Sequence, residues 1–357
     1  MARLSPGRGF TDVSLQQGQN ERMDSLTQVA LGAAVGEAVL GHRVGRKAAL
    51  WGAICGTLPD LDVLVPFADP VANFTYHRSF SHSLFVMLLA TPLLVWLIRK
   101  LHPADAEHRW GWAALVYLSL ATHALLDAFT IYGTQLFWPL TEYPVTWGTV
   151  FIIDPLVTLP LLFGLAAVIL SRKNPQRGYR INAVTLGLAT GYLAWSVGAQ
   201  LYVQGVAERA LAAQGIETTQ VLAQPGPFNT ILWRIVAMGE DGYHEGWYSL
   251  LDEHQDLSFD HHPSDADLLA GIEDHWPVQR LQWFTKGYYR VRDEGGDIVI
   301  TDLRMGVEGG YVFSFKVGER VGDRSQRVAA VQRAEMRSFE SLGPLWERLK
   351  GVGPPSP

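Results

Sequence analysis

Residues 110–131 read WGWAALVYLSLATHALLDAFTI, an apolar stretch as long as a helix that crosses a membrane. Such a helix needs about 20 mostly apolar residues. One histidine and one aspartate, His123 and Asp127, lie near the end of the stretch at positions i and i+4. That spacing puts both side chains on one helical face, where they can bind one ion. The stretch therefore predicts a membrane helix with a polar site near one end.

Five further segments have a similar apolar, helical character, which predicts six membrane crossings in all. They fall at 25–40, 47–67, 81–98, 150–170 and 181–203. The first is the weakest, because it carries Glu37 and many glycines and alanines. Its small residues favour close packing against a neighbouring helix. Asp154, before Pro155, is expected to cap the helix that follows it.

Basic residues gather in three of the connections between these segments. They are His42, Arg43, Arg46 and Lys47, then Arg99, Lys100 and Arg109, then Arg172, Lys173, Arg177 and Arg180. If all six segments cross, the three connections lie on one side, which the positive-inside rule assigns to the cytoplasm. The connections at 68–76 and 132–149, and everything after residue 204, then face the outer side.

The composition indicates a protein with two kinds of domain. Hydrophobic residues make up 48% of the 357 residues, which is high for a purely soluble protein and low for a chain of membrane helices alone. From residue 204 the sequence resembles that of a soluble domain. It predicts helices at 205–226 and 325–350, strands at 230–238, 246–251, 280–292, 297–303 and 311–317, and a hairpin turn at 293–297.

The expected fold class is mainly α: a polytopic membrane helical bundle followed by a small soluble α+β domain with an antiparallel sheet. Residues 1–22 lack the apolar core of a signal peptide and are expected to form a disordered leader, or one that precedes a true start at Met23. Residues 23–203 form the membrane-embedded domain, and residues 204–357 the soluble one.

Charge and cysteine content exclude two classes of site. The net charge of −6 provides no basic surface for nucleic acid, so nucleic acid is not expected as a partner. Cys55 is the single cysteine, which rules out an intramolecular disulfide and a thiolate zinc cluster. Any bound metal must therefore be held by His, Asp and Glu.

Two further motifs carry the residue types that bind metal. GTLPDLD brings Asp60 and Asp62 to the outer end of the second apolar segment, and YHRSFSHS brings His77 and His82 to the outer entrance of the third. The alternating directions of the segments place both motifs at the same depth as His123 and its neighbour at i+4. Buried His and Asp are costly in a lipid layer, so these residues are expected to face one another, and a metal ion would satisfy several at once.

Imidazole and carboxylate groups suit a divalent ion such as Zn²⁺. The expected metal ligands are Asp60, His82, His123 and Asp127. Asp62 and His77 are expected as further ligands, as partners of the ligands, or as catalytic groups such as a general base. Arg78, beside His77 at the mouth, is expected to bind an anionic group of the substrate such as a phosphate.

A fourth motif, DSLTQ, places Asp24 and Gln28 at i and i+4 at the outer start of the first segment. Asp24 is expected to cap that helix. Gln28 has two interpretations of equal weight: a hydrogen bond that packs two helices together, or a substitute for a metal ligand.

In their order, the motifs DSLTQ, LPDLD, HRSFSHS and HALLDAFTIYGTQLFWP resemble the YdjM family of inner-membrane-associated proteins, described as metal-dependent hydrolases. The resemblance covers about residues 23–200. The family's metal motif is similar to those of zinc-dependent phospholipase C and P1-type nucleases. Asp60, His82, His123 and Asp127 match its metal-ligand positions, whereas many relatives have His at the position of Gln28.

The resemblance implies a bacterial inner-membrane protein, and the positive-inside rule then places its C-terminal domain on the periplasmic side. The resemblance also implies a metal-dependent hydrolase, with zinc as the metal, membrane lipid as a partner, and an ester or phosphoester of a lipid or envelope component as substrate. The alternative is a membrane protein without enzymatic activity, whose His/Asp cluster is structural or handles ions or protons.

Two other clusters have a structural and a functional interpretation. The aromatic stretch FWPLTEYPVTW at 137–147 is typical of an interfacial belt, with a lipid-binding rim as the alternative. His254, His261 and His262 lie among acidic residues in 252–265. A solvated loop is the preferred interpretation there, and a second metal site the alternative.

Overall fold

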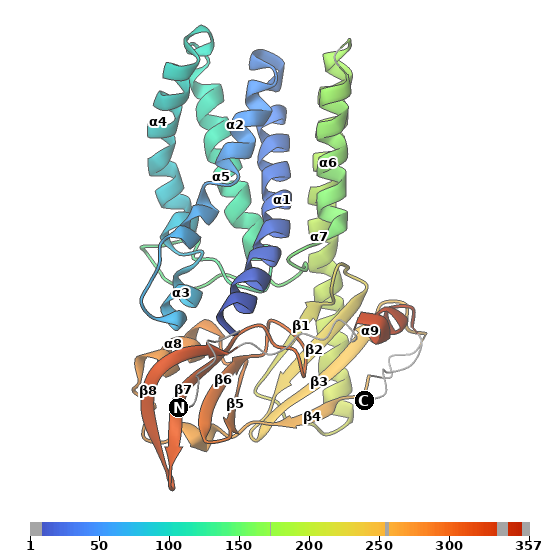
Figure 1. Ribbon diagram of the computed structural model, residues 1–357. Coiled ribbons are helices and arrows are strands. Elements are labelled where there is room, and N and C mark those ends of the chain that lie inside the picture. Colours follow the sequence, from blue (N-terminus) through green and yellow to red (C-terminus); the bar gives the residue numbers. More distant parts are fainter. Residues whose placement is uncertain (1–8, 172, 254–256, 334–341, 352–357) are drawn as a thin grey trace, which may run out of the picture.

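A computed structural model shows a helical bundle standing on two β-sheets (Figure 1). It describes residues 9–171, 173–253, 257–333 and 342–351, with the backbone alone for 9–25. About half of the chain is helical, and both sheets are antiparallel and four-stranded.

The bundle comprises α1 (Gly9–Val44), α2 (Lys47–Cys55), α3 (Pro70–Tyr76), α4 (Leu84–Leu101), α5 (Arg109–Phe129), α6 (Pro155–Leu170) and α7 (Pro175–Ala213), with short 3-10 turns η1 (Pro59–Leu64), η2 (Phe80–His82) and η3 (Pro103–Asp105). The turns α1–α2, α4–α5 and α6–α7 lie at the end of the bundle away from the sheets (Figure 1). The three basic connections therefore share one end of the molecule, and the C-terminal sheets lie at the other.

Two of the described helices, α4 and α5, are long and apolar enough to cross a membrane, and α6 is apolar but has only 16 residues. Crossing by all six predicted segments therefore stays a prediction. Asp154 caps α6 as expected, because its carboxylate accepts a hydrogen bond from the backbone N–H of Leu156. Asp24 lies inside α1, which begins at Gly9, and its side chain is outside the described residues.

The prediction of one long helix over 47–67 is wrong. α2 ends at Cys55, and the chain continues through Gly56 into η1, which begins at Pro59. Proline has no N–H to donate to a preceding carbonyl, so a helix is interrupted there. The interruption turns Asp60 and Asp62 inward from a short 3-10 turn, so neither continues along a helix axis.

Glycines let α1 and α2 pack with their backbones in contact. A Cβ atom on Gly52 would lie 2.1 Å from the carbonyl oxygen of Gly32, and one on Gly32 would lie 2.3 Å from that of Gly52. Such distances leave no room for a methyl group, since the obstacle on each side is backbone. The contact also places Gly56, which follows α2, beside α1.

The variant Gly52→Ala is therefore expected to lower the free energy of unfolding by about 2–3 kcal/mol, because the added methyl overpacks a backbone contact. Gly187, on the exposed side of α7 with no atom near its Cβ position, provides the matched control. Gly187→Ala is expected to be neutral or stabilising by up to about 1 kcal/mol. Denaturant titration of the detergent-solubilised protein measures both. Equal effects would contradict the packing described here.

The C-terminal domain has two sheets where the sequence predicted one. Their strands are β1 (Gln220–Pro225), β2 (Leu232–Met238), β3 (Gly242–Ser249) and β4 (Asp260–Pro263), then β5 (Tyr289–Glu294), β6 (Asp297–Asp302), β7 (Ser314–Val321) and β8 (Arg324–Arg333), joined by η4 (Ala266–Leu269) and α8 (Trp276–Phe284) and followed by α9 (Leu342–Leu349). The predicted hairpin at 293–297 is confirmed: β5 pairs with β6 through Gly295 and Gly296, both at positive φ.

Three other predictions in this region are wrong in part. In the range 205–226, predicted as helix, α7 ends at Ala213 and β1 follows. The range 280–292, predicted as a strand, starts within α8. The range 325–350, predicted as a helix, starts with the strand β8. In α8 the buried residues Val278, Leu281 and Phe284 follow helical spacing. In β8 nearly all residues are exposed or half-buried, so the strand lacks the two-residue alternation that would have marked it.

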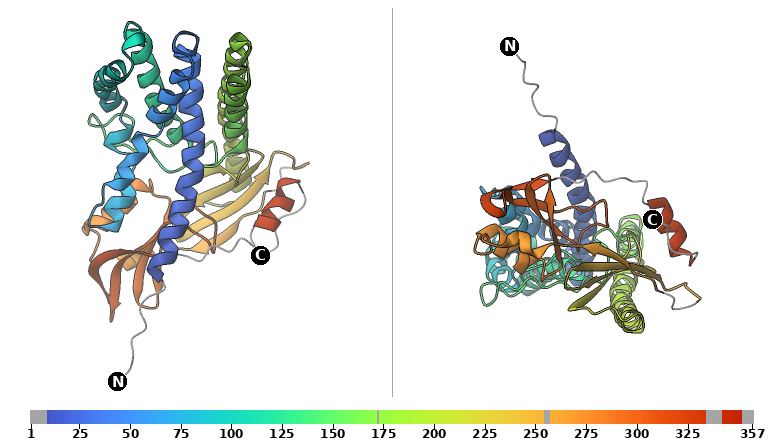
Figure 2. Two further views of the ribbon diagram at one scale, coloured as in Figure 1. Left: turned by 45° about the horizontal axis from the view of Figure 1, so that its top comes forward. Right: turned by 90° about the horizontal axis from the view of Figure 1, so that it is seen from below.

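Each sheet packs against a different part of the helical layer. The lower part of α7 lies along the first sheet (Figure 2), where Val203 and Ala207 contact Trp233 and Ile235. The second sheet packs with α8 against α3 and the chain that follows α5.

An ion pair in the second sheet reaches the bundle. The Arg304 guanidinium donates to both carboxylate oxygens of Asp302 at 2.9 and 2.6 Å, and its Nη1 donates to the Tyr132 carbonyl at 3.3 Å. Both charged side chains are buried. The pair therefore connects the sheet to the loop that follows α5.

Replacement of one member of this pair is expected to leave a buried charge. Arg304→Met should lower the free energy of unfolding by about 3–5 kcal/mol, since Asp302 loses its partner. Arg327→Met, which breaks an exposed pair with Asp274, is expected to have a much smaller effect, because solvent screens the pair. Thermal and denaturant unfolding of the two variants test the difference, and a loss below 1 kcal/mol for Arg304→Met would refute the assignment.

Candidate metal centre

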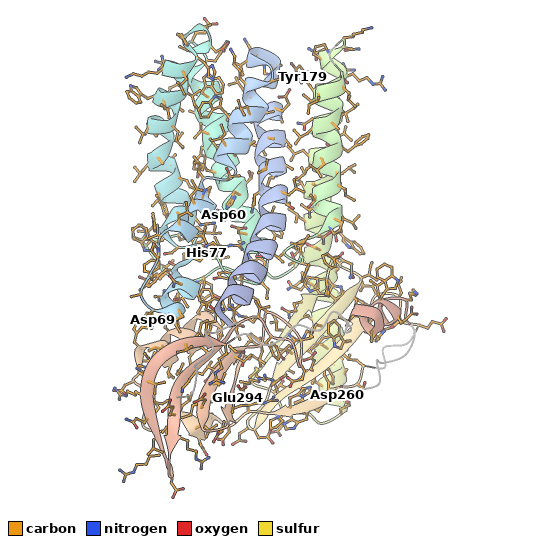
Figure 3. All side chains as sticks on the ribbon, viewed as in Figure 1. Asp60, Asp69, His77, Tyr179, Asp260 and Glu294 are labelled. Atoms are coloured by element: carbon orange, nitrogen blue, oxygen red, sulfur yellow. The ribbon has the colours of Figure 1, made fainter. Side chains whose placement is uncertain are left out.

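Four side chains from η1, η2 and α5 meet inside the bundle. One of them, Asp60, is labelled in Figure 3 and lies in the half of the bundle nearer the sheets. His82 Nε2 lies 3.0 Å from Asp127 Oδ2 and 3.5 Å from Asp60 Oδ1. His123 Nε2 lies 3.2 Å and 3.3 Å from the same two oxygens. The four predicted ligand atoms are thus brought within 4.8 Å of one another.

Hydrogen bonds on the far side of each ring fix how the histidines face this centre. His123 Nδ1 lies 2.8 Å from the Gly56 carbonyl oxygen, which can only accept, so Nδ1 carries the proton. His82 Nδ1 lies 2.9 Å from Ser81 Oγ, whose hydroxyl donates to Asp62 Oδ2 at 2.8 Å. Both Nδ1 atoms are therefore donors, and in each neutral ring Nε2 presents a lone pair to the centre.

These lone pairs provide a test of whether a metal fits. The two Nε2 atoms are 3.1 Å apart, and Asp127 Oδ2, which faces both, is buried without a hydrogen-bond donor among the described residues. Four electron-rich atoms in one buried space repel one another unless a cation or protons lie between them. Ligand atoms around a tetrahedral zinc are about 3.3–3.6 Å apart, close to the spacing seen. The residues present fit a divalent ion.

The other oxygen of Asp127 is held by two donors. Gln28 Nε2 donates to Oδ1 at 2.8 Å, and Arg78 Nη2 lies 3.3 Å from the same atom. Gln28 thus forms a hydrogen bond between helices, the first of the two interpretations drawn from the sequence. Its amide orients Asp127 so that Oδ2 faces the histidines.

Arg78 does not lie at the mouth, where the sequence placed it. Its side chain is 3% exposed, and Nη1 donates to Thr130 Oγ1 at 3.1 Å beside the contact with Asp127. The residue adopts φ 61°, which turns its side chain inward while the neighbouring His77 stays half-buried. Binding of a substrate anion by Arg78 stays a prediction, and what the structure shows is support for Asp127.

Asp62 and His77 form a pair next to the four convergent side chains. His77 Nδ1 donates to Asp62 Oδ1 at 2.9 Å, and the backbone N–H of Arg78 donates to Oδ2 at 3.0 Å. Burial raises the pKa of the Asp62 carboxyl, but the hydrogen bond and charge of His77 together with Ser81 outweigh it and hold this pKa below its usual range. Asp62 is thus a carboxylate that orients two histidines.

Comparison with known proteins agrees with the motifs in this region. A family model described as "YdjM inner membrane protein" matches residues 23–203, just over half of the chain. The chain belongs to the YdjM inner membrane protein family. All of the residues that converge on the candidate metal centre lie inside the matched range, whereas the two sheets lie outside it.

A curated relative from Bacillus subtilis (strain 168), named "Uncharacterized protein YfhP", is 30% identical over 152 residues. The alignment covers 40% of this chain and 46% of the relative, so the chain spans less than half of that protein's length. No solved structure matches the chain.

Several residues around the site were not predicted from the sequence. Ser81 and the Gly56 carbonyl fix the two imidazole rings, and Tyr132 packs edge-on against His77 at 5.5 Å between ring centroids. Ser81 could have been found, because it directly precedes a predicted ligand. The roles of a backbone carbonyl and of a packed tyrosine have no signal in one sequence.

The histidine tract of the C-terminal domain is not part of a candidate site among the described residues. His261 and His262 lie on the short edge strand β4, so the predicted loop is a strand in part. His261 is exposed and lies 3.3 Å from Asp241. His254 lies outside the described residues.

Proposed function

We propose that this protein is a membrane-embedded metal-dependent hydrolase that cleaves an ester, chiefly a phosphoester, of a lipid or envelope component. The observation that carries the proposal is that the Nε2 atoms of His82 and His123 face two carboxylate oxygens in one buried space. The Asp60 side chain is 26% exposed, so the centre is reachable from outside, as a hydrolytic site must be.

The arrangement of the chain supports a site at the outer face of the inner membrane. Asp60 of the candidate centre lies in the half of the bundle nearer the sheets, and the three basic turns lie at the other end (Figure 3). Basic turns mark the cytoplasmic side of inner-membrane proteins. With α4 and α5 as the clearest spans, the site and the C-terminal domain then face the periplasm.

Zinc is the ion we propose, since two imidazoles and two carboxylates suit it. A divalent ion bound there supplies a Lewis acid and lowers the pKa of water towards neutrality. Asp62 holds the ring of His77 in place through Nδ1, so His77 would accept at Nε2 the proton that the attacking water loses. Arg78 and Gln28 act through Asp127, which they orient.

A substrate screen tests the proposal. The detergent-purified protein, loaded with Zn²⁺, is assayed against phospholipids and chromogenic phosphodiesters beside Asp60→Asn and the exposed control Asp267→Asn. We expect hydrolysis by the wild type and Asp267→Asn that EDTA abolishes, and loss of activity in Asp60→Asn. Metal binding without hydrolysis of any ester would instead favour a cluster that is structural or handles ions.

A further inference from the structure

A groove runs along α4 from the candidate metal centre towards the basic end of the bundle. It has a volume of about 240 Å³ and lies between the chain after α2, one face of α4 and one residue of α5. Its lining includes Leu58, Val86, Ala90, Leu94 and Leu120. The groove is therefore apolar along nearly its whole length.

One end of this groove is lined by residues next to the site. Pro59 and Ser81, which line it, directly precede Asp60 and His82 in the chain. The Ser81 hydroxyl also hydrogen-bonds the ring of His82 at 2.9 Å. A molecule lying in the groove would thus place its polar end at the centre and its apolar part along α4.

The direction and the opening of the groove match a lipid. From Val86 to Leu94 it follows eight residues of α4, or about 12 Å. It leads from the end proposed to face outward towards the middle of the membrane layer, the direction that an acyl chain takes in the outer leaflet. Leu93, on its rim, is 66% exposed on the apolar outer face of α4, so a chain can enter sideways.

We infer that this groove binds the acyl chain of the substrate, which makes the substrate a lipid phosphoester that enters from the outer leaflet. The inference rests on the proposed function for the reaction and names the class of its substrate. The inference predicts that the enzyme prefers substrates with a long acyl chain, and that residues of α4, not the metal ligands, set this preference.

Two chromogenic diesters measure this selectivity: decyl and ethyl p-nitrophenyl phosphate, with the Zn²⁺-loaded protein in lipid nanodiscs. Ala90→Leu fills the groove, and Ala166→Leu makes the same change at an exposed position of α6. Ala90→Leu should lower kcat/KM for the decyl ester by at least about tenfold, because the chain loses buried contact. The ethyl ester should change by less than about twofold, and Ala166→Leu should leave both unchanged.

A binding measurement separates this inference from the proposed function. Phosphatidic acid with a diazirine in its acyl chain is photo-crosslinked to the protein in nanodiscs, and labelled peptides are mapped by mass spectrometry. We expect labels at exposed groove residues such as Leu93, at least about fivefold weaker in Ala90→Leu and unchanged in Ala166→Leu. If labelling is equally strong in Ala90→Leu, the lipid chain does not bind in the groove and the inference is wrong. If labelling falls in Ala90→Leu but the wild type hydrolyses neither ester, the proposed hydrolase is wrong and the groove assignment still holds.

Discussion

His123→Ala is expected to remove the metal from the purified protein and to abolish most of its hydrolytic activity. The ring donates to the Gly56 carbonyl on one side and presents Nε2 to Asp60 and Asp127 on the other, so no neighbour can replace it. Removing a residue that only hydrogen-bonds a metal ligand lowers metal affinity or activity by about 10–100-fold, and removing a ligand itself should have a larger effect. Metal affinity by competition with a chelator, beside the rate of ester hydrolysis, measures both effects.

The control is His108→Ala, which removes a histidine at the start of α5 that pairs with the exposed Glu107. It should keep the metal and the activity. A His123→Ala protein that is folded and still binds metal with unchanged affinity would exclude His123 as a ligand.

His77→Asn is expected to lower kcat by about 10²–10⁴-fold, the usual contribution of a general acid or base, with the metal content unchanged. The ring is oriented by Asp62, lies beside the four convergent side chains, and is 26% exposed where the solvent reaches the site. Asparagine can keep the hydrogen bond to Asp62 but cannot take up a proton. Steady-state kinetics with metal analysis of the same sample test the prediction.

Combining Asp62→Asn with His77→Asn tests whether Asp62 acts through His77. If Asp62 acts on the reaction only through His77, and not through Ser81 and His82, the double variant should be no slower than His77→Asn alone, because effects within one unit do not add. A change in kcat below about threefold for His77→Asn, or loss of the metal in that variant, would contradict the assignment of His77 as the group that moves the proton.

The convergence of the candidate site was predictable from the sequence because each ligand lies on a short motif. The i, i+4 spacing of His123 and Asp127 puts both on one face of α5, and the directions of the segments place Asp60 and His82 at the same depth. Neither inference needs knowledge of contacts between residues that are far apart in the chain. The inward direction of Arg78 could not be predicted, since it depends on a residue at positive φ.

The errors in the fold arise where tertiary contacts outweigh local pattern. The apolar run 47–67 looked like one span, but Pro59 divides it, and close contact of Gly32 with Gly52 fixes where α2 lies. β8 is a strand because β7 provides its hydrogen bonds, although its charged residues alone favour a helix. The division of one predicted sheet into two depends on contacts that no local pattern records.

The most direct test of a metal centre is elemental analysis of the wild-type protein, purified without chelators, together with X-ray absorption at the edge of the metal found. The four convergent side chains predict about one equivalent of a divalent ion, with imidazole and carboxylate scattering from His82, His123, Asp60 and Asp127. Well under one equivalent after incubation with Zn²⁺, or a bound metal without imidazole ligands, would contradict the account.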